Sequence, residues 1–122
     1  MKKIILVVED DKSYASSIST KLLEEDFDVS IVKDGDEAMK SARERKPDLI
    51  FLDIILPIRD GFDMLRELKS DPVLQNIPVL VVSNLGQEKD VEKARALGVV
   101  EYLVKANVSL NEVVEIIKKY SV

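Results

Sequence analysis

Five short apolar runs alternate along this chain with segments whose apolar residues recur at helical spacing, and this alternation restricts the fold. The runs are rich in valine, isoleucine and leucine, which is typical of strands buried on both faces. They lie at residues 4–8, 29–32, 49–52, 78–82 and 101–104. Strands that alternate with helices in this way form a parallel sheet with helices on both of its faces.

The ends of the helical segments carry boundary signals. Asp34 is followed three residues later by Glu37, and Ser109 is followed in the same way by Glu112, which is the pattern of a capped helix start. Gly98 follows a helical segment at the position where a left-handed residue closes a helix. These signals support helices after the second, fourth and fifth runs.

The composition of the runs predicts the strand order. The first, third and fourth runs are the most apolar and should be central, whereas the second contains Ser30 and, like the fifth, suits an edge. The expected order is 2-1-3-4-5, the flavodoxin-like arrangement of a (βα)5 three-layer sandwich. Ligands of such folds bind at the carboxyl ends of the strands, near the switch point between the first and third strands.

Length and composition indicate one domain over residues 1–122. With 46% hydrophobic and 34% charged residues the chain is neither disordered nor membrane-embedded. No apolar run approaches the roughly 20 residues of a spanning helix, and the start is too short in apolar residues for a signal peptide. We therefore expect a cytoplasmic protein with no membrane partner. The net charge of −5 argues against direct binding of nucleic acid, which requires a basic surface.

The chain has no cysteine and no histidine. The missing cysteine excludes disulfides, thiolate zinc sites and a cysteine nucleophile. The missing histidine removes the commonest general base and a favoured ligand of transition metals. Any chemistry must therefore use carboxylates, hydroxyls and amines.

Asp53 is a carboxylate within the apolar stretch 49–57, where a charge is costly unless it is paired, bound to metal or at an exposed strand end. Pro57 prevents the strand from continuing, so the chain should turn just after Asp53. From this stretch alone Asp53 has two readings, a functional carboxylate or a cap of the following turn.

Polar side chains also follow the other strands of the predicted sheet. Glu9 and Asp10 follow the first run, Ser83 the fourth and Lys105 the fifth, so all should meet Asp53 at one edge. Two carboxylates about 4 Å apart repel by about 4 kcal/mol at an effective dielectric constant near 20. Mg²⁺ would relieve this repulsion, and it prefers an all-oxygen site. The lysine suggests an additional anion, and the set suits phosphoryl transfer with an aspartate nucleophile.

In these motifs the chain resembles, over its whole length, the receiver domains of two-component response regulators, including the single-domain chemotaxis type. Each motif alone is weak, but the order and spacing of the set are specific. The motifs are Ile5-Leu-Val-Val-Glu-Asp10, Leu52-Asp53 with Pro57 and Asp60-Gly61, Val82-Ser83, and Tyr102-Leu-Val-Lys105.

The resemblance implies roles for the acidic residues. Asp53 would accept a phosphoryl group from a phosphohistidine on a sensor histidine kinase or phosphotransfer protein. Asp10, Asp53 and the backbone carbonyl of Ile55 would bind Mg²⁺, and Glu9 would assist through a water molecule.

The resemblance also implies how a phosphoryl group would be sensed. Lys105 would pair with phosphoryl oxygens, Ser83 would donate a hydrogen bond to one of them, and Tyr102 would move inward as a switch. The fourth helix, fifth strand and fifth helix would then bind a downstream protein. Such a protein is a monomer or weak dimer and a switch, not a turnover enzyme.

Three positions depart from the commonest family pattern. Glu9 stands where aspartate is more usual, Asn84 where a small residue is common, and Ala106 where a proline usually follows the lysine. That proline typically has a cis peptide bond, which costs about 2.5–4 kcal/mol before another residue type. Either the strained bond is kept here, or the loop is trans and Lys105 is aimed differently.

Three functions other than a phosphoacceptor switch are alternatives for this chain. The departures at Asn84 and Ala106 suggest an interaction module that has lost phosphorylation. A phosphatase with an aspartate nucleophile would usually have a second aspartate two residues later, where Ile55 stands. A flavin-binding protein is disfavoured because the acidic residues after the first run would repel a phosphate.

The chain ends directly after the last predicted helix, so we expect either a stand-alone receiver or one cut from a longer protein.

Overall fold

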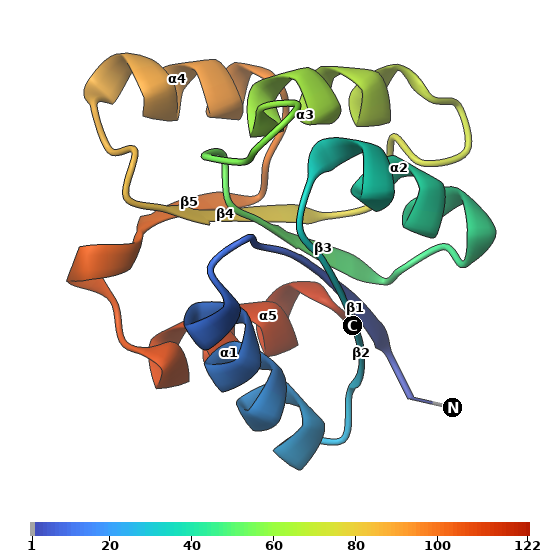
Figure 1. Ribbon diagram of the computed structural model, residues 1–122, viewed down its shortest axis with the longest axis vertical. Coiled ribbons are helices and arrows are strands. Elements are labelled where there is room, and N and C mark those ends of the chain that lie inside the picture. The colour runs from blue at the N-terminus through green and yellow to red at the C-terminus, as the bar shows by residue number, and fades with distance from the viewer. Residues whose placement is uncertain (1) are drawn as a thin grey trace.

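The structure, a computed structural model, describes residues 2–122, in which five strands alternate with five helices (Figure 1). The strands are β1 (Ile4–Val8), β2 (Asp28–Val32), β3 (Leu49–Leu52), β4 (Val79–Ser83) and β5 (Glu101–Val104). The helices are α1 (Lys12–Glu24), α2 (Gly35–Glu44), α3 (Gly61–Ser70), α4 (Glu88–Ala96) and α5 (Leu110–Tyr120). A short 3₁₀ turn, η1 (Lys105–Asn107), follows β5 and was not predicted.

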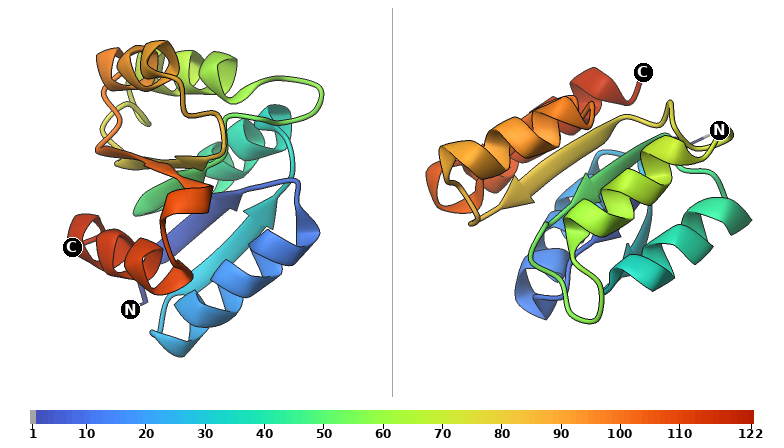
Figure 2. Two further views of the ribbon diagram at one scale, coloured as in Figure 1. Left: turned by 90° about the vertical axis from the view of Figure 1, so that its left-hand side faces the viewer. Right: turned by 90° about the horizontal axis from the view of Figure 1, so that it is seen from above.

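The strands form one parallel sheet in the order β2-β1-β3-β4-β5, which confirms the predicted flavodoxin-like topology. The two predicted edge strands, β2 and β5, are at the edges. Helices α1 and α5 cover one face of the sheet, and α2, α3 and α4 cover the other (Figures 1 and 2). The molecule is therefore a three-layer α/β/α sandwich.

Local side-chain chemistry fixes the helix starts. In four helices the side chain of the N-cap residue accepts a hydrogen bond from a backbone N–H three residues on, which satisfies one donor that the helix leaves free. These N-caps are Asp11, Asp34, Asp60 and Ser109. Ser109 and Glu112 form the predicted capping box. Gly98, with a φ of 87°, follows the end of α4 as expected.

The core consists of one apolar cluster on each face of the sheet. Successive β1 residues alternate between them, since Leu6 and Val8 pack under α2 to α4 and Ile5 and Val7 pack under α1 and α5. All four are almost completely inaccessible to solvent. Each fully buried side chain of this kind stabilises the fold by about 1.5–3 kcal/mol. The central strands are thus held rigidly, and so are the residues at their ends.

Within the described range 2–122, none of the helices combines the length and apolar composition that crossing a membrane requires.

Candidate functional site

The register of the central strands brings Glu9 and Asp53 side by side. Val8 is paired with Leu52, so the residues that follow them leave the sheet together at its carboxyl edge. The backbone N–H of Asp53 donates to the carbonyl of Val8 at 3.0 Å, which continues the ladder by one bond. The position of the Asp53 carboxylate is therefore tied to two central strands.

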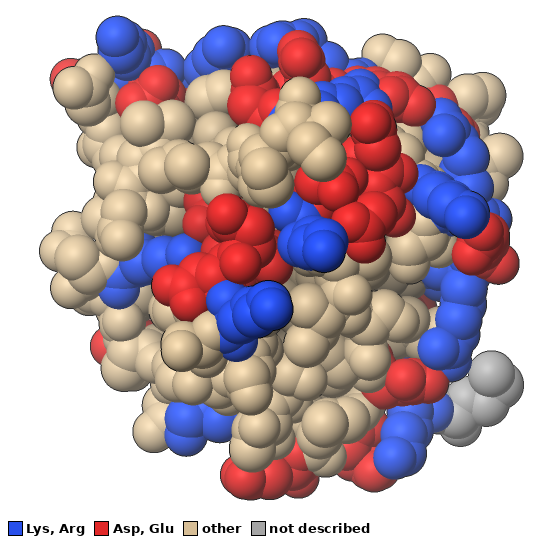
Figure 3. Space-filling model, viewed as in Figure 1, with Lys and Arg blue, Asp and Glu red and all other residues tan. Residues whose placement is uncertain are grey.

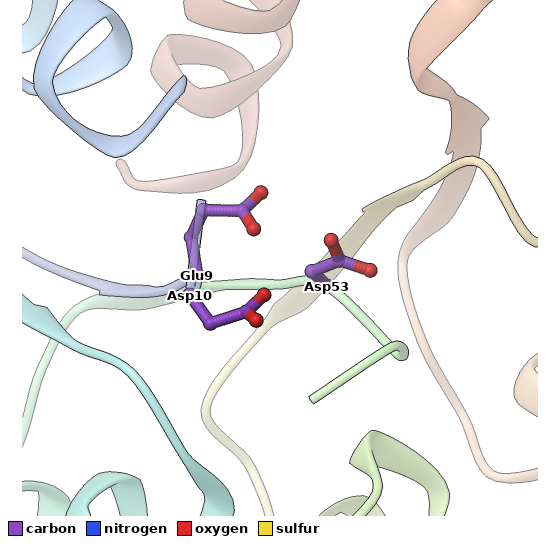
Figure 4. Close-up of side chains that lie close together, drawn as sticks. All are labelled: Glu9, Asp10 and Asp53. Carbon is purple, nitrogen blue, oxygen red and sulfur yellow. The ribbon is translucent and has the colours of Figure 1, made fainter. Parts of the chain in front are cut away.

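Three carboxylates converge at this edge. One oxygen atom from each of Glu9, Asp10 and Asp53 lies within 4.8 Å of the others. Glu9 and Asp10 project from the end of β1 and Asp53 from the end of β3, and the carboxylates of Glu9 and Asp10 point toward Asp53 (Figure 4). Glu9 and Asp53 are buried, with 2% and 4% of their surface exposed, whereas Asp10 is exposed. The cluster thus has a buried floor and an open side.

Lys105 is the cation of the site. Its Nζ donates a hydrogen bond to Asp53 Oδ2 at 2.8 Å and lies 2.5 Å from Glu9 Oε1. The lysine comes from η1, directly after β5, and its side chain is only 12% exposed. The long side chain reaches from the edge strand β5 back to the end of the central strand β3.

The charges of the site are unbalanced. Three carboxylates share one ammonium group, so the cluster has an excess of negative charge when all are ionised. Burial raises the pKa of Glu9 to about 7, and the nearby Asp53 charge adds to this rise while Lys105 opposes it. Burial works to lower the pKa of Lys105, but its contacts with Asp53 and Glu9 outweigh burial and raise it. The amine therefore stays protonated at neutral pH.

The donor set fits a hard divalent cation. All three acidic groups offer oxygen ligands, one side of the cluster is open, and an additional cation would offset the excess negative charge. Glu9, Asp10 and Asp53 are the residues that could hold such an ion. The backbone N–H of Ile55 donates a hydrogen bond to Asp53 Oδ1 at 2.9 Å. The side chain of Ile55 is exposed.

Ser83 is at the end of β4, where it is completely buried. Its Oγ accepts a hydrogen bond from the backbone N–H of Leu85 at 3.2 Å. Ser83 pairs in register with Val104, the residue before Lys105. The hydroxyl and the amine thus come from the ends of neighbouring strands.

Tyr102 lies inward in this structure, with 7% of its surface exposed. Its hydroxyl donates to the backbone carbonyl of Leu85, which lies in the loop between β4 and α4. Burial raises the pKa of Tyr102 to about 12, and the negative charges of Asp90 and Asp53 contribute to the rise. The tyrosine is therefore linked to the loop that directly follows Ser83.

The loop after Asp53 packs tightly on the start of α3. A Cβ atom at Gly61 would lie 2.7 Å from the Cα of Ile54 and 3.0 Å from the carbonyl oxygen of Asp53. The N–H of Gly61 donates to the carbonyl of Ile54 at 2.8 Å. Only glycine allows this close approach, which closes the loop beneath the site.

Sequence reasoning missed the role of Tyr14. Its ring lies beside Phe51, and the Nζ of Lys105 is 4.5 Å from the centre of the ring. Such a contact attracts a cation to the face of the ring. The sequence contained a signal for the inward position of Tyr14. Tyr14 lies four residues before Ile18, so both are on the predicted buried face of the helix.

The two departures after Ser83 and Lys105 are in contact. No peptide bond within residues 2–122 is cis, so the bond between Lys105 and Ala106 is trans, and Lys105 nevertheless contacts Asp53. The N–H of Ala106 donates to Asn84 Oδ1 at 3.1 Å. No pattern in the sequence indicates that these positions meet.

The surface around the cluster is mixed in charge. A pocket of about 460 Å³ opens beside Glu9 and Asp10, between α1, β2 and the start of α2. On the face shown in Figure 3, acidic side chains form patches interrupted by a few lysine or arginine side chains. This pattern agrees with the net charge of −5.

Comparisons with known proteins identify the family. The model of the response regulator receiver domain family matches residues 5–118. The DNA-binding response regulator MtrA of Mycobacterium tuberculosis is 34% identical over 105 residues, which make up 86% of this chain but 45% of that protein. The chain therefore spans less than half the length of this curated relative.

Solved structures agree over nearly the full chain. The phosphorylated cyanobacterial phytochrome response regulator RcpA is 37% identical with a TM-score of 0.85, covering 98% of this chain and 91% of that one. The receiver domain of the sensor histidine kinase PA1611 from Pseudomonas aeruginosa, with magnesium coordinated in its active-site cleft, is 26% identical with a TM-score of 0.88 and covers 99% and 98%. With its matching fold, acidic cluster and sequence, this chain belongs to the response regulator receiver domain family.

Proposed function

We propose that this protein is a signalling switch in which Asp53 accepts a phosphoryl group in a Mg²⁺-dependent reaction. The observation that carries the proposal is the bridging position of Lys105, whose amine contacts both Asp53 and Glu9 inside a cluster of three carboxylates. A structural ion pair needs one carboxylate per amine. A cluster with excess acid beside one buried cation is suited to bind a divalent metal and a phosphoryl group together.

The donor is a phosphohistidine of a sensor histidine kinase or phosphotransfer protein. A carboxylate oxygen of Asp53 attacks phosphorus, and the new O–P bond forms as the P–N bond to the imidazole breaks. The histidine, protonated on its other ring nitrogen, takes the electron pair of the P–N bond and leaves as the neutral base. The N–H of Ile55 on Oδ1 and the amine of Lys105 on Oδ2 orient the carboxylate for this attack. Since Asp53 stays bonded to the phosphoryl group, the protein is a phosphoacceptor and not a turnover enzyme.

The metal would be held by Asp10, Asp53 and the carbonyl of Ile55, with Glu9 acting through a water molecule. Mg²⁺ would neutralise charge on the phosphoryl oxygens and allow the anionic donor to approach the acidic cluster. The magnesium bound in the active-site cleft of the PA1611 receiver domain supports this assignment.

Phosphorylation would act on a two-state domain. Shifting such a domain from 1:99 to 99:1 requires about 5.5 kcal/mol of differential binding to the phosphoryl group. Lys105 and the Ser83 hydroxyl supply part of it, and the loop that bonds to Tyr102 transmits the change to the surface of α4, β5 and α5. That surface would bind a downstream protein, with the chain acting in the cytoplasm as a monomer or weak dimer.

The test is incubation with acetyl phosphate and Mg²⁺, followed by intact-mass and peptide-mass measurement. One phosphoryl group should be added at Asp53, and neither Asp53→Asn nor chelation of the metal should allow it. Asp26→Asn, a change at an exposed residue in the turn between α1 and β2, is the matched control and should be phosphorylated like the wild type. If no adduct forms and beryllofluoride also fails to bind, the proposal is wrong.

The alternative is an interaction module that no longer depends on phosphorylation, motivated by Asn84 and Ala106. It predicts no measurable Mg²⁺ affinity in the wild type. It also predicts that a partner captured by the protein binds Asp53→Asn equally well.

A further inference from the structure

One hydrogen bond joins the residues that directly follow Ser83 and Lys105. The N–H of Ala106 donates to Asn84 Oδ1 at 3.1 Å. Asn84 is the residue after Ser83, and Ala106 is the residue after Lys105. Under the proposed function, Ser83 and Lys105 contact phosphoryl oxygens. The bond therefore connects the direct neighbours of these two residues.

Further contacts hold this part of the β4–α4 loop against β5. The hydroxyl of Tyr102 donates to the carbonyl of Leu85. A Cβ atom at Gly86 would lie 2.9 Å from Cγ2 of Val104, so the backbone of the loop lies directly on the end of the strand. These contacts limit where the Asn84 backbone can be, and they place its amide over the η1 turn.

The bond depends on both residue types. A proline at position 106 would have no N–H to donate, and an alanine at position 84 would have no side-chain acceptor. Two of the three positions at which this chain departs from the common receiver pattern, Asn84 and Ala106, thus supply the acceptor and the donor of one bond.

The hydrogen bond that closes the η1 turn is weak. The N–H of Val108, the residue after η1, donates to the carbonyl of Lys105 at 3.4 Å, which is long. The Lys105 side chain is flexible by nature, and its Nζ must stay near Asp53 for the pair to hold. A constraint on the adjacent residue reduces the freedom of the turn.

We propose that Asn84 is a positioning residue for Lys105, holding the η1 turn through the Ala106 N–H so that the amine remains on Asp53 and in fixed relation to Ser83. The inference rests on the proposed function of Asp53. Asn84 itself contacts none of the reacting groups. The hydrogen bond from Ala106 to Asn84 restricts the turn, as a proline at position 106 would otherwise do.

The bond is tested directly by hydrogen exchange of the Ala106 amide, measured by NMR on the metal-free protein. Asn84→Ala should speed exchange at Ala106 about three- to tenfold, the range expected for loss of one such bond. Asn84→Asp keeps an acceptor and should preserve the protection. Asn76→Ala, at an exposed asparagine in the loop before β4, is the matched control and should change nothing at Ala106.

The consequence for Lys105 is tested by kinetics and metal binding. Asn84→Ala should slow phosphorylation by acetyl phosphate about three- to tenfold, whereas the Kd for Mg²⁺ alone, from NMR titration, should stay unchanged because the carboxylates are untouched. The NMR signal of the Lys105 side-chain ammonium should broaden or shift in Asn84→Ala only. A merely structural effect would weaken metal binding as well.

The inference is overturned if Asn84→Ala leaves the exchange of the Ala106 amide and the phosphorylation rate at their wild-type values. It is also overturned if the Kd for Mg²⁺ rises by the same factor as the rate falls. Failure of the proposed function has a different signature, since the wild type itself would then accept no phosphoryl group. The Ala106 exchange result stands on its own in that case and still decides whether the bond exists.

Discussion

The raised pKa of Glu9 makes the stability of the metal-free protein depend on pH. The carboxyl has a pKa of about 7 in the folded chain and an ordinary value of 4.5 when exposed. Between these values the folded state binds the proton and the unfolded state does not. The stability that this group contributes is therefore fully present below pH 4.5 and is lost as the pH rises to about 7. A separation of this size corresponds to on the order of 3 kcal/mol.

Glu9→Gln is the informative substitution, because the amide has the shape of the protonated acid and does not titrate. In EDTA, the free energy of unfolding of the wild type should fall relative to Glu9→Gln by on the order of 3 kcal/mol between pH 4.5 and 8. Urea unfolding followed by far-UV circular dichroism measures this, since the chain has no tryptophan. Glu24→Gln, at an exposed position at the end of α1, is the control and should remove none of the dependence.

Adding Mg²⁺ should stabilise the wild type more at pH 8 than at pH 5, because the ion favours the ionised cluster. The reasoning is refuted if the unfolding free energies of the wild type and Glu9→Gln run parallel across this pH range. Parallel curves would mean that the Glu9 carboxyl titrates alike in the folded and unfolded chains.

Three substitutions test other parts of the site. Gly61→Ala places a methyl group 2.7 Å from the Cα of Ile54, so the backbone must shift and the free energy of urea unfolding should fall by about 1–3 kcal/mol; unchanged stability would contradict the close approach. Lys105→Met removes the cation from Asp53 and should slow phosphorylation by acetyl phosphate about 100-fold, while a wild-type rate would exclude a role for the amine. Tyr14→Leu removes the ring beside Lys105 and should slow phosphorylation by acetyl phosphate about two- to fivefold. Tyr14→Phe keeps a ring and should not slow it. Equal rates in the two variants would argue against the cation–π contact.

The elements of this fold were predictable because their signals are local. The N-cap of α2 at Asp34 and the capping box at Ser109 depend on residues within one helical turn. The strand order followed from one further step, since a strand covered on both faces must be mostly apolar, as β1 and β3 are and as β4 is up to Ser83 at its end. The η1 turn was not predicted because it has only three residues and neither a capping residue nor a run of apolar residues.

The sequence by itself determined the sheet and the edge at which the carboxylates meet, because parallel strands end together and the first polar residue after each one must leave the core there. The tertiary structure alone decided the distances. Lys105 reaches Asp53 across 52 positions of sequence, and Asn84 meets Ala106 across 22. The pKa of Glu9 was equally hidden, since it follows from burial and from charges brought in by β3 and η1. Contacts of this kind depend on the packing of whole elements, and no local pattern of residues encodes them.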